Sequence, residues 1–252
     1  MTGNLPLAGV VLNSDIVDSS AGGYPRHGEL GRTAESLITE AILKSPVPDA
    51  WTRSSRGDGE VTVAPGSIPA AWLLGDFVDA LYEGAVAYNR NKRREDKDDH
   101  RLRLRVGIAG GDVLIEEGVP RGGDALVVAA RLQNSAAARE AMRLLPDAPI
   151  AVILADDVYQ RVVPHGAKAF DRRQFREITV DVNGISTTAW LYLPRTYPPQ
   201  ITPSATPAPS SSPSPAATSR ATAGSKYGIS ITNSDGIQVG DNNEQNNYRY
   251  GR

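Results

Sequence analysis

Residues 7–17 read LAGVVLNSDIV, an apolar run whose C-terminal end carries the carboxylate of Asp15. A continuous apolar run such as residues 7–12 is typical of a strand buried inside a sheet, because a strand with one face in water alternates apolar and polar residues instead. Such a strand delivers Asp15 to one edge of the sheet.

The neighbouring segments alternate between helical and strand patterns. Helical spacing predicts helices over residues 26–44, 68–91, 124–145 and 156–162, and strand patterns occupy 51–55, 60–64, 102–109, 113–117, 150–154, 175–182 and 186–193. The turns Arg56-Gly57-Asp58-Gly59 and Asn183-Gly184 indicate two hairpins. This order predicts an α+β fold, an α/β sandwich whose mainly antiparallel, ferredoxin-like sheet has helices packed on one face.

Composition divides the 252 residues into three parts. The patterned segments predict a globular domain over residues 1–194. Pro, Ser, Thr and Ala dominate residues 195–225, where Arg220 is the only charge after Arg195, and such a segment cannot bury enough surface to offset its chain entropy. We expect a disordered linker there, followed by a short polar tail over residues 226–252.

Charge and composition exclude several classes of protein. The chain has 27 Lys and Arg against 29 Asp and Glu, so it lacks the positive excess that a bulk grip on nucleic acid needs. It has no cysteine, which excludes disulfides, thiolate metal sites and a cysteine nucleophile. No apolar stretch approaches the roughly 20 residues of a membrane span, and the N-terminus lacks a signal-peptide pattern. We expect a cytoplasmic protein without a nucleic-acid or membrane partner.

Two carboxylates occupy places where the chain is held rigid. Asp15 ends the first strand, and Asp58 lies in the first hairpin turn. If these strands are neighbours, both carboxylates lie at one edge of the sheet, where hard oxygen ligands suit Mg²⁺ or Mn²⁺. The alternatives are a helix cap for Asp15 and ordinary turn chemistry for Asp58.

Four segments in order resemble the class III nucleotidyl cyclase (adenylate/guanylate cyclase homology) domain across residues 7–194. They are SDIVDSS at 14–20, RGDGEVTV at 56–63, LRVGIAGGDVLIEEG at 104–118 and GGDALVVAARLQNS at 122–135. Each segment alone is weak, but the four together are specific at the level of the family. The phrase RGDGEVTVAP and the closing TTAWLYLP look similar to a divergent actinobacterial branch.

The resemblance implies an enzyme that converts a nucleoside triphosphate into a cyclic nucleotide and pyrophosphate. Two Mg²⁺ or Mn²⁺ ions would be held by Asp15, Asp58 and the backbone carbonyl of Ile16, and Arg131 would stabilise charge on the α-phosphate. The family builds its sites in a head-to-tail homodimer, with the aspartates from one subunit and the arginine from the other. A monomer would then be inactive.

Some positions depart from the family pattern. Val127 stands where the family commonly has a ribose-positioning Asn, and the two base-selecting positions fall on Ser54 and Pro120. The base is therefore open, and a catalytically degenerate module that binds a nucleotide or a partner is the alternative function. Three nearby arginines are candidates for reading a base or holding phosphate, or else are solvated surface residues: Arg53, Arg56 and Arg121.

The tail carries a separate motif, GIQVGDNNEQNNY at residues 236–248. Its amide content and β-branched alternation suit stacking of identical chains. The motif resembles bacterial amyloid signalling motifs related to the RIP homotypic interaction motif, and the matching residues are Ile237, Gln238, Val239, Gly240 and Asn243. The resemblance implies self-assembly and a receptor protein with a matching motif, whereas composition alone favours a disordered polar tail.

Overall fold

The apolar run near the N-terminus forms β1 (Leu7–Ile16), a central strand of one sheet. Our computed structural model of the chain describes residues 5–19, 23–57, 59–92, 101–165 and 170–201, and all of them belong to one compact unit. The other elements, in chain order, are α1 (Gly23–Leu43), the 3₁₀ turn Pro48–Ala50, β2 (Thr52–Arg56), β3 (Gly59–Pro65), α2 (Ala70–Trp72), the π-helical segment Leu73–Phe77, α3 (Val78–Asn91), β4 (Leu104–Glu116), β5 (Val119–Gly122), α4 (Asp124–Gln133), α5 (Ala136–Leu144), β6 (Ile150–Ala155), α6 (Asp156–Val162), the 3₁₀ turn Arg172–Gln174, β7 (Phe175–Val182) and β8 (Ile185–Tyr192).

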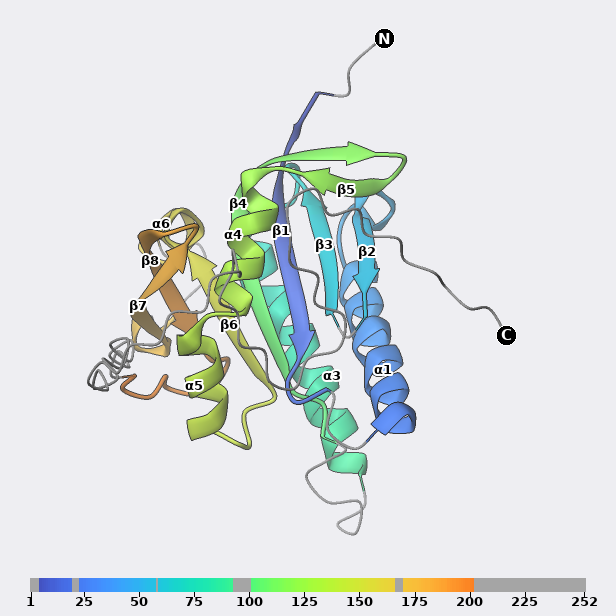
Figure 1. The fold of residues 1–252 in the computed structure, drawn as a ribbon, viewed down its shortest axis with the longest axis vertical. Helices are drawn as coiled ribbons and strands as arrows, with labels where there is room; N and C mark the ends of the chain where they lie inside the picture. The colour runs from blue at the N-terminus through green and yellow to red at the C-terminus, as the bar shows by residue number, and fades with distance from the viewer. Residues whose placement is uncertain (1–4, 20–22, 58, 93–100, 166–169, 202–252) are drawn as a thin grey trace, which may run out of the picture. The chain divides into compact units, whose positions relative to one another are not determined.

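Among the described residues the sheet has eight strands. Seven of them follow the order β2-β3-β1-β4-β6-β8-β7, and β5 pairs with β4 outside this path (Figure 1). The pairing is antiparallel throughout except between β4 and β6. The predicted α+β fold with a mainly antiparallel sheet is confirmed.

Helices cover both faces of the sheet, and the expectation of one covered face is wrong. Asn13 of β1 bonds Gln133 of α4 on one face. On the other face, Arg53 of β2 donates a hydrogen bond to Thr39 of α1. The sheet register places Arg53 in the same row as Leu12. Successive side chains of a strand point to opposite faces, so this row faces away from Asn13. The physical reason is the apolar run in β1, where three consecutive residues, 10–12, are buried and therefore need cover on both sides.

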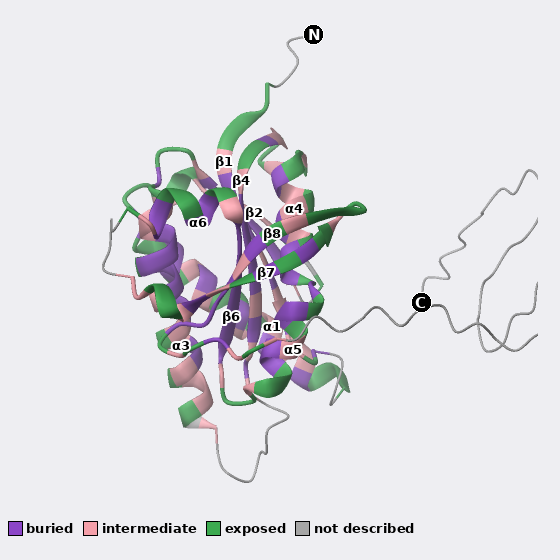
Figure 2. Cartoon of the chain, turned by 90° about the vertical axis from the view of Figure 1, so that its left-hand side faces the viewer, coloured by how far each residue is buried: buried purple, intermediate pink, exposed green. Residues whose placement is uncertain are grey.

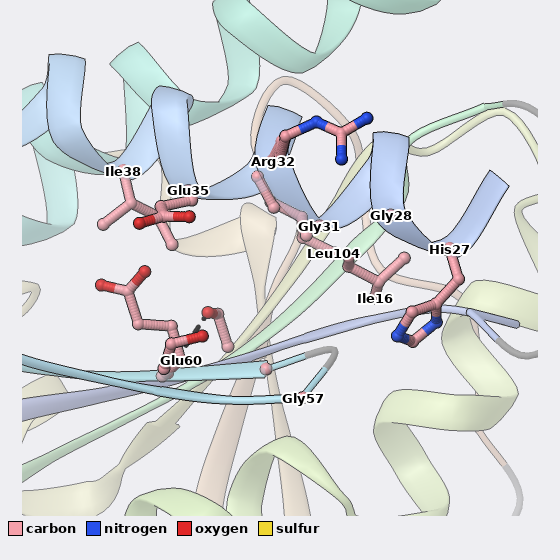
Figure 3. A pocket seen from close by; sticks show the side chains of 14 residues that line it. Ile16, His27, Gly28, Gly31, Arg32, Glu35, Ile38, Gly57, Glu60 and Leu104 are labelled. Carbon is pink, nitrogen blue, oxygen red and sulfur yellow. Dashed lines mark hydrogen bonds between the residues drawn. The ribbon is translucent and has the colours of Figure 1, made fainter. Parts of the chain in front are cut away.

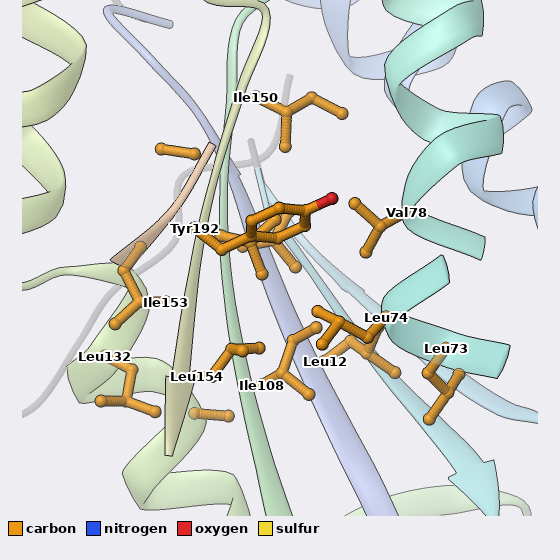
Figure 4. Close-up of a cluster of buried hydrophobic side chains, with 14 of the residues drawn as sticks. Leu12, Leu73, Leu74, Val78, Ile108, Leu132, Ile150, Ile153, Leu154 and Tyr192 are labelled. Carbon is orange, nitrogen blue, oxygen red and sulfur yellow. The ribbon is translucent and has the colours of Figure 1, made fainter. Parts of the chain in front are cut away.

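The side chains of the core follow this alternation (Figure 4). Leu12, Ile108 and Leu154 occupy one row across β1, β4 and β6, on the face covered by α3 and the π-helical segment before it. Leu132 of α4 and Ile153 of β6 lie on the other face. Figure 2 shows the strands buried between the two layers.

Two expected elements differ in the structure. Residues 102–117 were expected to break at Gly110-Gly111, but β4 runs through both glycines and turns only at Glu117 and Gly118, which have positive φ of 51° and 73°. The helix expected over residues 124–145 is two helices. Ser135 separates them, because its hydroxyl accepts a hydrogen bond from the Ala138 N–H at 3.2 Å and caps the N-terminus of α5.

The two expected hairpins are present. β2 pairs with β3, and β7 pairs with β8 across Asn183 and Gly184, which both have positive φ (55° and 81°), as a type I′ turn requires. Residues 195–201 still contact the domain, since Arg195 forms an ion pair with Glu83 at 2.7 Å and Ile201 packs against the core. Within the described segments, no helix is both long enough and apolar enough to cross a bilayer.

Candidate active site

The carboxylate of Asp15 lies where three strands meet. In the sheet register Asp15 is opposite Gly59 of β3 and Arg105 of β4. Arg105 forms an ion pair with Oδ2 of Asp15, and the two side chains are only 13% and 18% exposed. Gln133 of α4 donates a second hydrogen bond to the same oxygen at 2.9 Å. The predicted site residue is thus a largely buried carboxylate that is held by donors from two other elements.

The side-chain amide of Gln133 also forms a hydrogen bond through its oxygen. Its Oε1 accepts a hydrogen bond from Nδ2 of Asn13 at 3.1 Å. An ionised carboxylate can only accept, so the nitrogen of the Gln133 amide must face Asp15 and its oxygen must face Asn13. Hydrogen bonds therefore run in one direction, from Asn13 through Gln133 to Asp15.

Of the other predicted metal ligands, the structure describes Ile16 and the neighbours of Asp58. Ile16 is the last residue of β1, directly after Asp15. Asp58 lies outside the described residues, but Gly59, which follows it, is paired with Asp15. Arg56 is the last residue of β2 and pairs with Gly59 across the hairpin. The register therefore brings the predicted hairpin to the end of β1.

The donors at this place suit a hard cation. The Asp15 carboxylate and the Ile16 carbonyl are oxygen donors, which Mg²⁺ and Mn²⁺ prefer. In the part of the chain that the structure describes, no group of three or more His, Cys, Asp or Glu side chains is gathered for a metal ion. The described ligands therefore fit an ion of this class but make only part of a coordination shell, and Asp58 would have to add to it.

An arginine-lined pocket of about 370 Å³ adjoins Asp15. Its lining residues are Val17, Asp18, Arg103, Arg105, Arg139, Met142 and Arg143. Arg103 is held by the carbonyl oxygens of Leu145 at 3.0 Å and Ala148 at 3.3 Å, and also by that of Met142. Burial lowers the pKa of the Arg103 guanidinium, which nevertheless stays charged because an arginine does not lose its proton in proteins. The pocket therefore offers fixed positive charge beside the carboxylate.

Arg131 points away from the Asp15 of its own chain. Successive residues of an α-helix are about 100° apart, so Arg131 and Gln133 lie about 200° apart on α4. Gln133 faces the sheet, and Arg131 is exposed together with Val127, whose side chain is 41% exposed four residues earlier. Within the described part of the chain the guanidinium of Arg131 has no hydrogen-bond or ion-pair partner. Its guanidinium is available to a ligand or to a second subunit.

The other sequence candidates divide between the two faces. Ser54 is half-buried in the same row as Asn13, on the face that carries Asp15. Pro120 is buried in β5, and Arg121 next to it is exposed. Arg53 lies on the opposite face and donates to both oxygens of the buried Glu60, at 2.5 and 2.8 Å. The structure therefore gives Arg53 a role in the fold instead of a place beside Asp15.

A second pocket, of about 290 Å³, lies on that opposite face between α1 and the strands β1 to β3 (Figure 3). Gly28 and Gly31 of α1 leave room for it, and His27, Arg32 and Glu35 supply polar groups at its wall. This pocket is separated from the Asp15 carboxylate by the sheet.

Sequence reasoning missed the residues that hold Asp15, namely Arg105, Gln133 and Asn13. Arg105 lies 90 positions from Asp15 in the chain, and Gln133 lies 118 positions away. One signal was present for Gln133: it follows Ala129 by four residues and Ala125 by eight, so helical spacing puts this amide on the buried side of α4.

The sequence matches no protein-family model and no curated protein. The fold matches solved cyclase structures. An adenylate/guanylate cyclase/hydrolase from Silicibacter pomeroyi aligns with a TM-score of 0.52 and 20% identity, over 76% of this chain and 99% of that one. The guanylyl cyclase Cya2 aligns with a TM-score of 0.52 and 14% identity over 78% and 99%, and a bacterial light-regulated adenylyl cyclase with 0.50 and 15% over 75% and 91%. Residues 5–201 therefore have the fold of adenylate and guanylate cyclase domains.

Proposed function

We propose that this protein is a class III nucleotidyl cyclase, which converts a nucleoside triphosphate into a 3′,5′-cyclic nucleotide and pyrophosphate. The observation that carries the proposal is the Asp15 carboxylate at the end of β1, in register with the β2–β3 hairpin and beside an arginine-lined pocket. In this reaction the 3′-hydroxyl loses its proton to solvent, and its oxygen bonds to the α-phosphorus. The bond from that phosphorus to the bridging oxygen breaks, and pyrophosphate leaves with that oxygen.

Asp15, the carbonyl of Ile16 and Asp58 would hold two Mg²⁺ or Mn²⁺ ions. When bound, such ions lower the pKa of the 3′-hydroxyl and neutralise charge on the leaving pyrophosphate. The contribution of the chain itself is to hold the carboxylate still. Arg105 does so from β4, through its ion pair with Oδ2 of Asp15.

The arginine-lined pocket supports a substrate that carries several phosphates. Arg103 is fixed by three carbonyl oxygens, so its positive charge stays in place before a ligand binds. Arg139 lines the same pocket from α5, and its guanidinium bonds the carbonyl oxygen of Asn134. Guanidinium groups bind phosphate oxygens through a planar set of donors, which suits a triphosphate better than a neutral ligand.

A homodimer completes the site in this proposal. Arg131 faces away from the Asp15 of its own chain, so one subunit cannot bring the two residues together at one phosphate. In a head-to-tail dimer, Arg131 of the partner subunit would reach the α-phosphate and stabilise the negative charge that builds up on it. Two equivalent sites would form at the interface.

The test uses the purified full chain with each of the four nucleoside triphosphates and Mn²⁺, and detects cyclic product. We expect product from the wild type, none from Asp15→Asn or Arg131→Ala alone, and partial recovery when these two variants are mixed, because one site of a mixed dimer keeps both residues. Asp147→Asn, at an exposed carboxylate paired with Arg101, is the control and should stay active.

Two results would contradict the proposal. No cyclic product from any of the four nucleotides would exclude the cyclase activity. Product that survives Asp58→Ala would exclude the assigned metal ligands.

One observation favours a second candidate function. Val127 is exposed on the same side of α4 as Arg131, where the family that the sequence resembles commonly has an Asn, and a valine has no hydrogen-bond donor for a ribose. The alternative is a catalytically degenerate module that binds a nucleotide or a protein partner. Nucleotide binding without product, with product gained by Val127→Asn, would favour this alternative.

We further propose that the tail recruits the domain for intracellular signalling. Its motif residues lie outside the described residues, so this proposal rests on the sequence: Ile237, Gln238, Val239, Gly240 and Asn243. Assembly with a receptor that bears a matching motif would raise the local concentration of the domain and favour the dimer. The same proposal includes three expectations from the sequence. The globular domain ends at residue 194 and the linker ends at residue 225. The domain is of the actinobacterial type, and the protein is cytoplasmic.

A further inference from the structure

Gln133 is a buried amide that the proposed chemistry does not use. Its exposed fraction is 6%, and it is the last residue of α4. Its Nε2 donates to Oδ2 of Asp15 at 2.9 Å, and its Oε1 accepts from Asn13 at 3.1 Å. Both ends of the amide are therefore occupied.

We propose that Gln133 is a positioning residue, which holds the Asp15 carboxylate in the orientation that binds a divalent cation. The proposal rests on the proposed function, because Asp15 is a metal ligand only there. In this role Gln133 acts through Asp15 and does not itself bind the nucleotide or the ion.

The geometry around Oδ2 supports this role. Arg105 and Gln133 donate to the same oxygen from two different elements, so rotation of the carboxylate would break both bonds. A carboxylate has about four lone-pair sites, and two donors leave it capacity for a cation. Groups that bond the ligands of a metal in this way fix ligand orientation and raise metal affinity.

The backbone of α4 is itself fixed at this point. A Cβ added to Gly107 of β4 would overlap the carbonyl oxygen of Ala129 and lie 2.7 Å from the backbone nitrogen of Gln133. The helix therefore rests directly on the strand beneath it. Arg131 lies on the exposed side of the same helix. In a dimer, α4 would therefore contribute Gln133 to the site of its own subunit and Arg131 to the site of the partner subunit.

The experiment measures Mn²⁺ binding to the full chain without nucleotide, by electron paramagnetic resonance of free Mn²⁺. Gln133→Met keeps the side-chain volume and removes the donor, and we expect it to weaken binding about 10- to 100-fold. The matched control is Gln160→Met. Gln160 donates to the carboxylate of Asp156 at 3.0 Å on the surface of α6, and its loss should leave Mn²⁺ binding unchanged.

Two further variants separate the donor from the fold. Gln133→Glu keeps the shape and an acceptor for Asn13 but presents a carboxylate to Asp15, and we expect it to bind Mn²⁺ at least as poorly as Gln133→Met. Asn13→Ala frees the far end of the amide and should weaken binding in the same direction by a smaller factor. At saturating Mn²⁺, Gln133→Met should lower kcat and leave KM for the nucleotide unchanged.

Asp15→Asn distinguishes the two ways of failing. If Asp15→Asn abolishes Mn²⁺ binding while folded Gln133→Met binds within twofold of the wild type, the positioning role is overturned and the proposed function stands. If Gln133→Met does not fold, Asn13→Ala decides, and wild-type affinity in that variant overturns the role. If no Mn²⁺ binding depends on Asp15, the metal site and the role of Gln133 are both overturned.

Discussion

The main chains of Gly107 in β4 and Ala129 in α4 lie directly against each other, with no room for a side chain between them. The position of α4 on the sheet is therefore set by contact between backbones. Gln133 and Arg131 both take their places from this contact, because they follow Ala129 by four and two residues.

Gly107→Ala should destabilise the protein. An added methyl group must push α4 off the strand, and overpacking of this kind costs about 1–3 kcal/mol. We expect the upper part of that range, because the obstacle is backbone and cannot rotate away. Urea unfolding of the full chain measures the change in the free energy of unfolding.

Gly31→Ala is the control for this prediction. Gly31 lies within α1 with nothing within 4 Å of an added Cβ, so the substitution should be neutral or stabilise the helix by about 0.4–1 kcal/mol. Equal stability of Gly107→Ala and the wild type would contradict the close contact.

Much of this fold could be predicted from local patterns. The buried strand β1 and the strand pairs of both hairpins depend on neighbouring residues, and all three are present. The continuation of β4 through Gly110-Gly111 could not be predicted, because two glycines in a row have little strand propensity by themselves. Pairing of both glycines with β1, and of the following residues with β5, stabilises the strand there. The cap at Ser135 was also missed, since the alanine-rich sequence on either side suits a single helix.

Arg53→Met should destabilise the protein by about 3 kcal/mol. Glu60 is only 6% exposed, so without Arg53 its charge stays buried. Among the described residues, the hydroxyl of Thr62 is then the one side-chain donor left to the Glu60 carboxylate, at 2.9 Å. Breaking a buried pair from one side costs about 3–5 kcal/mol, and the partial exposure of Arg53 favours the lower end. Urea unfolding measures the loss.

The double variant Arg53→Met with Glu60→Gln should recover part of that stability, because no unpaired charge is left. Arg143→Met, which breaks the exposed pair with Glu140, should leave stability nearly unchanged, because water screens an exposed ion pair. A loss in Arg53→Met no larger than that in Arg143→Met would show that the Arg53 pair is not important for the fold.

Tyr192 should make the protein sensitive to alkaline pH. Burial, with a further contribution from the Asp79 carboxylate, raises the pKa of Tyr192 to about 12. The folded pKa lies above the ordinary value of 10.0, so the folded state resists loss of this proton. The stability from the neutral hydroxyl is complete below pH 10 and is lost as pH rises from 10 to 12.

Unfolding by urea between pH 8 and 11.5 checks this prediction. The decline in stability above pH 10 should be shallower in Tyr192→Phe than in the wild type. Tyr24→Phe, at a side chain that is 93% exposed, should decline as the wild type does. Identical slopes for all three proteins would contradict it.

Arg105→Met should make stability depend on a divalent cation. The variant removes a charged donor from the largely buried Asp15 carboxylate, and hydrogen bonds to charged groups contribute about 1.5–3 kcal/mol. We expect that loss in a chelator, and partial recovery with Mn²⁺ if Asp15 is a metal ligand. Thermal unfolding with and without Mn²⁺ measures both, and Arg161→Met, at the exposed pair with Asp157, is the control.

A peptide of residues 226–252 should form fibres with cross-β spacing. The amide and β-branched side chains of its motif can stack as ladders in identical chains. The pair Gln238→Ala and Gly240→Ala should weaken fibre formation, as measured by fibre diffraction and a dye-binding assay. A wild-type peptide that stays monomeric at high concentration would exclude self-assembly.

The candidate site divides into what local patterns reveal and what only the fold reveals. Asp15 is a site prediction because it lies near the end of a strand, and Arg131 because its helix carries a motif that resembles a known family; both stay predictions. Arg105 and Gln133 were not predictable as partners of Asp15, since their contacts depend on strand register and on how α4 lies on the sheet. Contacts between residues so far apart in the chain leave no pattern in the neighbouring sequence. The helical spacing that places Gln133 on the buried side of α4 is the one local indication.

The ion pair between Arg105 and Asp15 has a consequence for the resting protein. The carboxylate has a positive partner before any cation arrives, so it is not left as a bare charge inside the fold. The chain can therefore fold and persist where divalent ions are scarce. If Asp15 holds a cation, as we propose, cation supply would change how much of the folded protein is active and would leave the amount of folded protein unchanged.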